Sequence, residues 1–189
     1  MPVITAGYVF SATGVTIGLK QLKDKDIVKT AVLSSAFFVA SLLHVPLGPS
    51  NVHLILNGLL GLMLGSVGFC AIFAALLLQA ILFQFGGLTT LGVNTFNMAM
   101  PAWMCFLLFS RLIKGNKVPL VILGFVTGFI SVALSAVLLS FSLILSGEHF
   151  ESSAKVILIA HIPVMIIDGI ITGFVLQFIK KVKPEMLCI

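Results

Sequence analysis

Long apolar runs, separated by short polar or glycine-rich breaks, make up most of this chain, and the pattern predicts helices that cross a membrane. A helix rises about 1.5 Å per residue, so roughly 20 apolar residues span the ~30 Å hydrocarbon core of a bilayer. We expect helices at Val3–Leu19, Ile27–Val45, Val52–Leu64, Val67–Phe85, Val93–Ile113, Pro119–Leu145 and Lys155–Lys180. The predicted fold class is therefore an all-α membrane protein, a bundle of about seven transmembrane helices forming a single domain over residues 1–189.

The breaks between the runs are as informative as the runs. A Pro/Gly loop at 46–51 and the pair Gly65-Ser66 separate the second, third and fourth helices, and a glycine-rich loop, Gly86–Gly92, separates the fourth from the fifth. Adjacent glycines do not readily continue a helix, and non-helical backbone at membrane depth persists only where it is buried in protein or lines a cavity. Gln79 and Asn94 flank this loop, which indicates either a polar site or amide hydrogen bonds that join helices.

Composition supports the membrane class and excludes others. Hydrophobic residues make up 59% of the chain and charged residues 9%, whereas soluble domains carry about 25% charged residues. The net charge of +5 comes from cations that flank the apolar runs, which is typical of membrane anchoring rather than of nucleic-acid binding. The three cysteines have no paired spacing, so no disulfide or metal site is assigned to them. The first twenty residues lack the basic start of a cleavable secretory signal.

The basic residues also predict the orientation. They cluster at 20–29, 111–117 and 180–183, and short cytoplasmic loops collect Lys and Arg. Seven crossings place all three clusters on one side, whereas six would place the first cluster opposite the other two. We therefore expect a multi-pass protein of the inner (plasma) membrane, with its amino terminus outside and its carboxyl terminus in the cytoplasm. The loop ending at His53 and the Gly86–Gly92 loop then both face outward.

Four histidines and one aspartate are the candidates for chemistry. His53 is placed at the start of the third helix, with Asn57 one turn further on the same face. Neutral imidazole suits Ni, Co, Zn and Cu, so His53 is either a metal ligand or an interfacial histidine bonded to a loop carbonyl. His44 either approaches His53 or is a simple interface residue. His149 lies in an acidic loop, which either collects cations weakly or is merely solvated.

His161 and Asp168 are seven residues apart and share a face of the last predicted helix. Ionisable groups inside a span usually point toward the interior of the bundle. The open interpretations are a proton relay, a distant metal ligand, a dock for a partner subunit, and a buried polar brace, of which the brace is preferred. The chain has neither a nucleotide-binding Gly-Lys-Ser/Thr loop nor a His-Glu-x-x-His motif, so we do not expect an enzyme.

Three stretches resemble one known family. They are the segment from Pro46 to His53 (Pro-Leu-Gly-Pro-Ser-Asn-Val-His), the run from Gly86 to Asn94 (Gly-Gly-Leu-Thr-Thr-Leu-Gly-Val-Asn) and the tail from His161 through Asp168 to Glu185. Together they are similar to the CbiM/NikM family, the substrate-capturing components of energy-coupling-factor importers for cobalt and nickel. The resemblance extends over nearly the whole chain, and the glycine-rich run is its most specific part.

The resemblance implies a transported Co²⁺ or Ni²⁺ ion, with no cofactor, captured at the outer face. It makes His53 the expected metal ligand, and it assigns the shaping of the site to Ser50, Asn57, Gln79, Gly86, Gly87, Thr89 and Asn94. It also implies partners: a coupling transmembrane subunit, separate ATP-binding subunits and a small accessory membrane subunit, all within the lipid bilayer and without nucleic acid. The tail resembles the cobalt branch slightly more than the nickel branch.

The amino terminus departs from the family pattern. Members typically begin Met-His-Ile-x-Glu-Gly, and their free amino terminus and second-position histidine help to bind the metal. This chain begins Met1-Pro2-Val3-Ile4, and proline has no backbone N–H to deprotonate toward a metal. We expect that the rest of the site belongs to an upstream Met-His segment. The alternatives are a divergent structural or regulatory membrane subunit without a metal site, and a proton-coupled carrier that uses His161 and Asp168.

Overall fold

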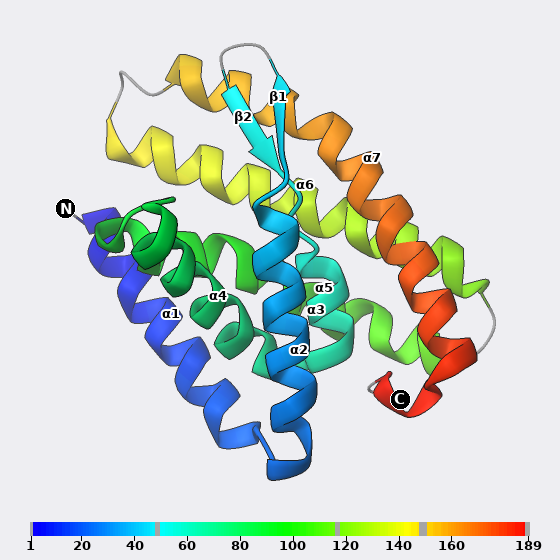
Figure 1. The fold of residues 1–189 in the computed structure, drawn as a ribbon. Helices are drawn as coiled ribbons and strands as arrows, with labels where there is room; N and C mark the ends of the chain where they lie inside the picture. The colour runs from blue at the N-terminus through cyan, green and yellow to red at the C-terminus, as the bar shows by residue number, and fades with distance from the viewer. Residues whose placement is uncertain (1, 48–49, 116–117, 148–150, 188–189) are drawn as a thin grey trace.

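The computed structural model of the chain describes residues 2–47, 50–115, 118–147 and 151–187. Seven α-helices and a two-stranded ribbon are described within these ranges (Figure 1). The helices are α1 (Pro2–Gln21), α2 (Asp24–Ser41), α3 (Asn57–Leu64), α4 (Gly68–Phe83), α5 (Leu91–Gly115), α6 (Leu120–Ser146) and α7 (Glu151–Val182). The strands are β1 (His44–Leu47) and β2 (Ser50–His53), and short 3-10 turns lie at Gly65–Val67 (η1), Leu88–Thr90 (η2) and Pro184–Met186 (η4).

Five of the predicted helices match the structure to within a few residues. They are α1, α4, α5, α6 and α7, whose apolar runs are long and are bounded by glycine, proline or charge. For example, α6 starts directly after Pro119, which has no N–H to donate, and stops before Gly147. The rule that a long apolar run bounded by helix breakers forms one helix therefore holds for most of the chain.

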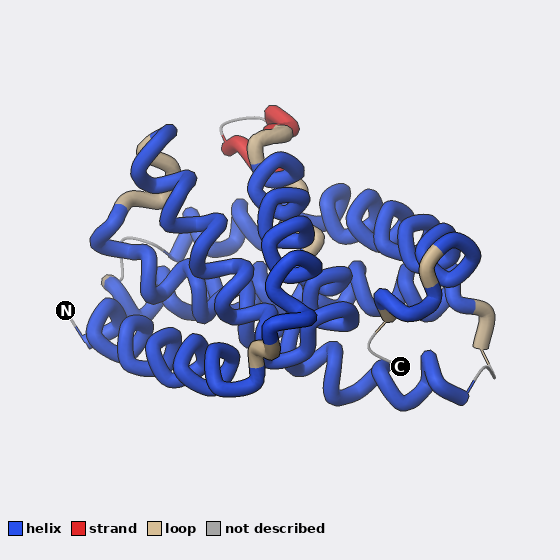
Figure 2. The backbone as a smooth tube through the Cα atoms, turned by 60° about the horizontal axis from the view of Figure 1, so that its bottom comes forward, coloured by secondary structure: helices blue, strands red, loops and turns tan. Residues whose placement is uncertain are grey.

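The segment after α2 was predicted wrongly. The second helix was expected to reach Val45 and the third to begin at Val52, but α2 ends at Ser41 and α3 begins at Asn57. Between them β1 and β2 form an antiparallel ribbon in which His44 pairs with His53 and Val45 with Val52. This ribbon continues beyond the end of α2 (Figures 1 and 2). The predicted fold class is corrected to this extent, because the helical protein contains a small sheet.

Helix α3 is too short to cross a bilayer, because eight residues extend only about 12 Å. The chain then turns at Gly65, whose φ of +59° is left-handed backbone that glycine adopts at little cost. Five helical stretches are long and apolar enough to span: Pro2–Gln21, Asn57–Phe83, Leu88–Ile113, Leu120–Ser146 and Glu151–Val182. The stretch Asn57–Phe83 combines α3 and α4, and α2 is not among the helices that are long and apolar enough to span. Seven crossings therefore remain a prediction.

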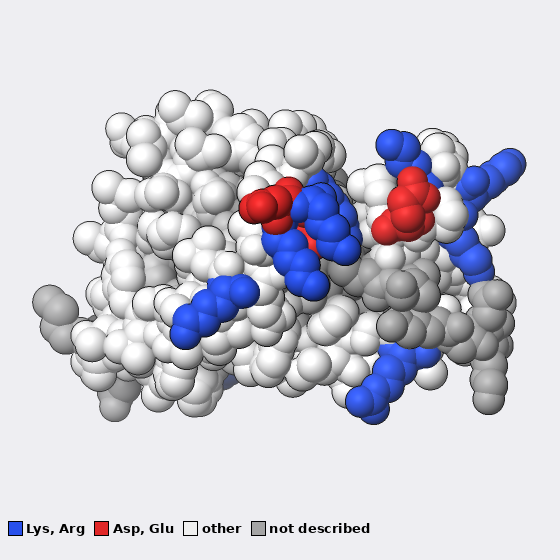
Figure 3. Space-filling view, turned by 90° about the horizontal axis from the view of Figure 1, so that it is seen from below, with Lys and Arg blue, Asp and Glu red and all other residues white. Residues whose placement is uncertain are grey.

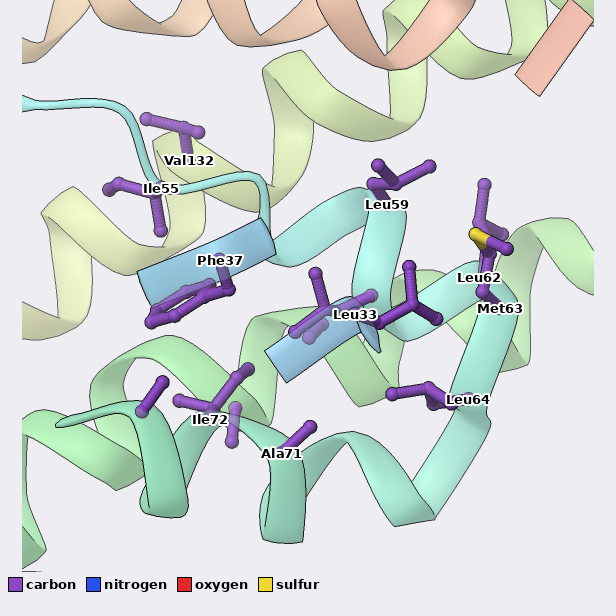
Figure 4. Close-up of a cluster of buried hydrophobic side chains, with 14 of the residues drawn as sticks. Leu33, Phe37, Ile55, Leu59, Leu62, Met63, Leu64, Ala71, Ile72 and Val132 are labelled. Carbon is purple, nitrogen blue, oxygen red and sulfur yellow. The ribbon is translucent and has the colours of Figure 1, made fainter. Parts of the chain in front are cut away.

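The hydrophobic core surrounds α3. All eight of its residues are buried, and Leu59, Leu62 and Met63 lie among side chains from α2, α4 and α6 (Figure 4). Leu33 and Phe37 of α2 approach it from one side. The segment between β2 and α3 places Ile55 near Val132 of α6. Leu64, Ala71 and Ile72 belong to the same core cluster and are also labelled in Figure 4. A short helix at the centre thus holds the longer helices around it.

Helices α6 and α7 lie side by side along most of their length (Figure 1). A Cβ atom added at Gly124 would come within 2.6 Å of the Cα of Gly173, so this contact requires glycine on both helices. On the outer surface of the pair, Phe174 and Phe178 are each 65% exposed. Such large exposed aromatic side chains are consistent with a surface that faces lipid.

The charged side chains are unevenly distributed. Viewed from below Figure 1, several Lys and Arg side chains lie on a face that is otherwise largely uncharged (Figure 3). This is the end of the molecule at which α1 turns into α2 and at which the chain ends (Figure 1). The arrangement agrees with the predicted clustering of cations on one side, while the side of the membrane on which this face lies stays a prediction.

Candidate metal-capture site

A cavity of about 160 Å³ lies where α2, β2, α4, α5 and α6 meet. Its lining consists of Ser41, His53, Leu76, Gln79, Phe85, Gly86, Leu91, Asn94, Met98 and Leu139. Four of the residues expected to bind metal or shape the site, His53, Gln79, Gly86 and Asn94, are therefore brought to one place. His53 ends β2, Gln79 and Gly86 belong to α4 and the loop after it, and Asn94 belongs to α5. Because these segments are far apart in sequence, the fold assembles the cavity.

His53 ends β2 and presents a partly buried imidazole to the cavity. Its Nδ1 lies 3.0 Å from the carbonyl oxygen of Leu54. A carbonyl oxygen only accepts, so Nδ1 carries the proton and donates it, which puts the ring lone pair on Nε2. A backbone carbonyl that holds one ring nitrogen in this way is the usual support for a metal-binding histidine. The cross-strand partner of His53 is His44, whose side chain lies outside the described part of the structure.

The opposite wall of the cavity is formed by the end of α4 and the loop after it. Gln79 is buried, and its amide Nε2 donates a hydrogen bond to the hydroxyl of Ser41 on α2. The backbone N–H of Phe85 donates to the Gln79 carbonyl over 3.3 Å, which closes the end of α4. One glutamine thus ties α2 to α4 and fixes the point at which α4 ends, beside the cavity.

The Gly86–Gly92 loop is held together by its own polar groups. Gly86 has a φ of +72°, and a Cβ atom added there would lie 2.7 Å from Nδ2 of Asn94. The hydroxyl of Thr90 donates to the Gly86 carbonyl, and Asn94 Nδ2 donates to Thr90 Oγ1 over 3.3 Å. Glycine is required at position 86 both by its backbone conformation and by its closeness to Asn94. Helix α4 ends at Phe83 and the next turn begins at Leu88, while the placement of this loop at the outer face stays a prediction.

The amino-terminal part of α1 packs against the same loop. Tyr8 donates its hydroxyl hydrogen to the carbonyl of Leu88, and Ser11 donates to the carbonyl of Gly92 over 2.6 Å. Gly7 of α1 is in close contact with Val93. These bonds satisfy carbonyls of the interrupted segment, and they place the start of α1 next to the wall of the cavity that contains Gly86 and Asn94.

Other predicted site-shaping residues lie elsewhere. Asn57 was expected to share a face with His53, but it begins α3, is fully buried, and its Nδ2 donates to the Met98 carbonyl and to Ser135 Oγ. Its position is a consequence of the non-helical backbone at 54–56, which sequence periodicity did not indicate. Gly87 and Thr89 do not line the cavity. The side chain of Ser50 lies outside the described residues, as does His149.

Asp168 of α7 holds the backbone just before α3. Its two carboxylate oxygens accept hydrogen bonds from the N–H groups of Ile55 and Leu56, at 3.1 and 3.2 Å, and its side chain is fully buried. His161 instead bonds through Nδ1 to the carbonyl of Ile157, one turn earlier in α7, at 2.7 Å. The described contacts therefore favour the interpretation of Asp168 as a brace over a relay shared with His161.

Six lining residues were not among the predicted site residues: Ser41, Leu76, Phe85, Leu91, Met98 and Leu139. Met98 follows Asn94 by four positions and so lies on the same face of α5, a spacing that could have revealed it. Ser41 and Leu139 gave no local signal, because only the packing of α2 and α6 against α4 and α5 brings them to the cavity. Among the described residues, no group of three or more His, Cys, Asp or Glu side chains is arranged to hold a metal ion.

Comparison with known proteins decides the family. The sequence model described as "CbiM: Cobalt uptake substrate-specific transmembrane region" matches residues 1–186. The chain belongs to the CbiM family. A protein of Haemophilus influenzae named "Putative metal transport protein" is 40% identical over 98% of this chain and 92% of its own length. The "Cobalt transport protein CbiM" of Kyrpidia tusciae is 29% identical over 89% of this chain and 73% of its own length.

A solved structure shows the same fold. A crystal structure titled as a truncated transition metal transporter superposes with a TM-score of 0.83, covering 95% of this chain and 94% of that one, at 24% sequence identity. At this level of identity the likeness concerns the fold alone. The CbiM-family chain is thus an integral membrane protein with the fold of a membrane transporter.

Proposed function

We propose that this chain is the substrate-binding membrane component of an energy-coupling-factor importer, and that it captures Co²⁺ or Ni²⁺ at its extracytoplasmic face. The observation that carries the proposal is the cavity in which His53 meets Gln79, Gly86 and Asn94. Membership of the CbiM family supports the metal as substrate. The ion is cargo, so the chain itself performs no chemical reaction, and separate ATP-binding subunits with a coupling transmembrane subunit supply the energy.

The donor set of the cavity fits a borderline transition metal. The imidazole of His53 supplies a nitrogen donor to the cavity, and N-rich sites bind Ni²⁺ and Co²⁺ far better than Mg²⁺ or Ca²⁺. Amide oxygens from Gln79 and Asn94 and the thioether of Met98 supply weaker donors in the same wall. The described residues that line the cavity include no carboxylate, which disfavours hard cations.

One histidine does not complete a tight site, so further nitrogen ligands are needed. Tyr8 and Ser11 fasten the first turns of α1 to the loop that lines the cavity. An amino-terminal Met-His segment of the kind seen in the family would approach the cavity from this end. Completion by such a segment would favour a planar nitrogen site and hence Ni²⁺ or Cu²⁺ over Co²⁺, since geometry rather than affinity selects among these ions.

Isothermal titration with Ni²⁺ and with Co²⁺ tests the proposal, on the chain as given and on a form that includes any in-frame residues encoded upstream. Replacing His53 by Ala should weaken binding by more than about 100-fold, because it removes a ligand rather than its support. The matched control is His161→Ala, which removes a buried imidazole that lies outside the cavity and should leave metal affinity within about threefold.

The controls separate the alternatives. If neither form of the chain binds either ion while both fold, metal capture is abandoned and a structural or regulatory role replaces it. If binding is as strong in His53→Ala as in the unchanged chain, the cavity is not the capture site. Loss of binding in both histidine variants would point instead to a general loss of structure, which circular dichroism and thermal unfolding would reveal.

A further inference from the structure

A second hollow, distinct from the cavity around His53, opens where α1 turns into α2. It has a volume of about 480 Å³ and lies between the end of α1, the start of α2 and the turn from α3 into α4. Three lysines and one carboxylate line it: Lys20, Lys23, Lys29 and Asp26. Three positive charges and one negative charge leave a local charge of +2, so the hollow attracts an anion.

The floor of the hollow is apolar. Met63, Leu64 and Val67, at the end of α3 and in the turn that follows, line it and are buried against the core. The buried Thr30 also lines the hollow, and its hydroxyl bonds to the Asp26 carbonyl within α2. The small surface that Leu64 and Val67 leave exposed and the aliphatic stems of the lysines are apolar, and a small inorganic anion would not cover them. A ligand with both an anionic and an apolar part fits the two halves of the hollow better.

The surroundings place the hollow at the edge of the bilayer. Leu19 on α1 and Val28 on α2, next to the lysines in sequence, are 57% and 73% exposed. In an integral membrane protein, large apolar side chains exposed to this degree face acyl chains. Lysines bend toward the headgroup layer from such positions. The hollow therefore opens where phosphate groups and the first acyl carbons of a lipid meet.

We propose that this hollow binds an anionic phospholipid, with its phosphate among Lys20, Lys23 and Lys29 and its first acyl carbons over Leu64 and Val67. Basic pockets between the membrane-facing ends of helices recognise anionic headgroups in this manner. The inference does not depend on metal capture, because none of these residues lines the cavity around His53. A bound lipid would link α1, α2 and the end of α3 at one end of the bundle.

The test measures binding of phosphatidylglycerol with a fluorescent acyl chain to the full chain in neutral detergent, in competition with unlabelled phosphatidylcholine. The double variant Lys20→Gln/Lys23→Gln should lose about 30-fold in affinity, taking about 1 kcal/mol per lysine near an anionic headgroup and 1.4 kcal/mol per tenfold. Lys20→Arg/Lys23→Arg should keep most of the affinity, which shows that charge rather than folding is measured. Ni²⁺ binding should be unchanged in both variants.

A matched control removes the same charge elsewhere. Lys181→Gln/Lys183→Gln takes two exposed lysines from the end of α7 and the residues after it, outside the hollow, and should leave phosphatidylglycerol affinity within about twofold. Equal losses in the two double variants would overturn the proposal in favour of diffuse surface attraction. Displacement of the labelled lipid by millimolar inorganic phosphate would overturn the lipid as ligand. Unchanged lipid affinity in Lys20→Gln/Lys23→Gln together with lost binding to the coupling subunit would make the hollow a protein dock.

Discussion

Two segments of this chain leave the helical conformation within the bundle, and they are stabilised in different ways. One, at 54–56, precedes α3 and contains Leu56 with a φ of +51°; the other, at 84–90, follows α4 and contains Gln84 with a φ of +59°. Ile55 and Leu56 are buried, whereas Phe85 and Leu88 are 43% and 55% exposed. The first segment is thus deep in the protein and the second lies at its rim.

The depth of each segment decides which groups form hydrogen bonds with its backbone N–H and C=O groups. Two N–H groups of the deep segment are held by a carboxylate from α7, more than one hundred residues later in the chain. The rim segment relies on nearby hydroxyls, from Thr90 within the loop and from Tyr8 on the adjacent α1. Without water nearby, an unbonded amide is expensive, so a buried break requires a strong acceptor while an exposed one does not.

The largest effect is expected at Asp168. Changing it to Ala leaves the N–H groups of Ile55 and Leu56 without acceptors, and should lower the free energy of unfolding by about 3–5 kcal/mol. Asp168→Asn keeps one oxygen acceptor and should lose less. Thermal unfolding in detergent measures both. The control Glu185→Ala removes an exposed carboxylate and should change stability by less than about 0.5 kcal/mol.

The same variants distinguish the brace from a relay. If Asp168 is a brace, its replacement lowers stability. Metal binding then weakens only because the segment that carries His53 becomes less ordered. An Asp168→Asn chain that unfolds at the unchanged temperature and binds metal, yet supports no uptake in the assembled importer, would replace the brace by a role in coupling.

An intermediate effect is expected at Gly86, with Gly87 as the matched control. Both have positive φ values, +72° and +71°, at which a Cβ atom is strained, so alanine at either costs about 1–3 kcal/mol. A Cβ atom at Gly86 also meets Asn94 Nδ2 at 2.7 Å, whereas at Gly87 it would lie 4.0 Å from Thr89 Oγ1. Gly86→Ala should therefore weaken Ni²⁺ binding about tenfold in titration and Gly87→Ala should not. Equal effects would show that strain alone matters and that Asn94 does not shape the site.

The smallest effect is expected at the rim contact of Tyr8. Tyr8→Phe removes one hydroxyl that donates to the Leu88 carbonyl in an exposed position, and water replaces it there if the loop faces the outside as predicted. We expect a loss of about 0.5–1 kcal/mol in thermal unfolding. A loss as large as that of Asp168→Ala would contradict the difference between the two segments, because it would mean that the rim segment also lacks access to solvent.

Much of the fold could be predicted because its signals are local. The long apolar runs of α6 and α7 and the glycines that end α4 act within their own segments, so the membrane class and the bounds of five helices follow from the sequence. The ribbon at 44–53 could not be predicted, since each strand has only four residues and β1 contains Pro46, a residue that argues against a strand. The number of crossings and their orientation stay predictions.

Part of the candidate site could be predicted for the same reason. The glycine-rich loop and its flanking amides marked Gln79, Gly86 and Asn94, and the resemblance marked His53. Ser41 and Leu139 were missed because they join the cavity only through packing between helices, and Asn57 was misplaced because α3 starts later than expected.

The sequence by itself determined that this chain resides in a membrane, where most of its helices begin and end, and to which family it belongs. Those properties depend on hydrophobicity, glycine and charge over about twenty neighbouring residues. The tertiary structure alone decided that Asp168 holds the backbone before α3, and that His53 ends a strand and faces Gln79 and Asn94 across a cavity. Both depend on contacts between segments far apart in the chain, where an acceptor or a wall is supplied by residues that the local pattern does not include.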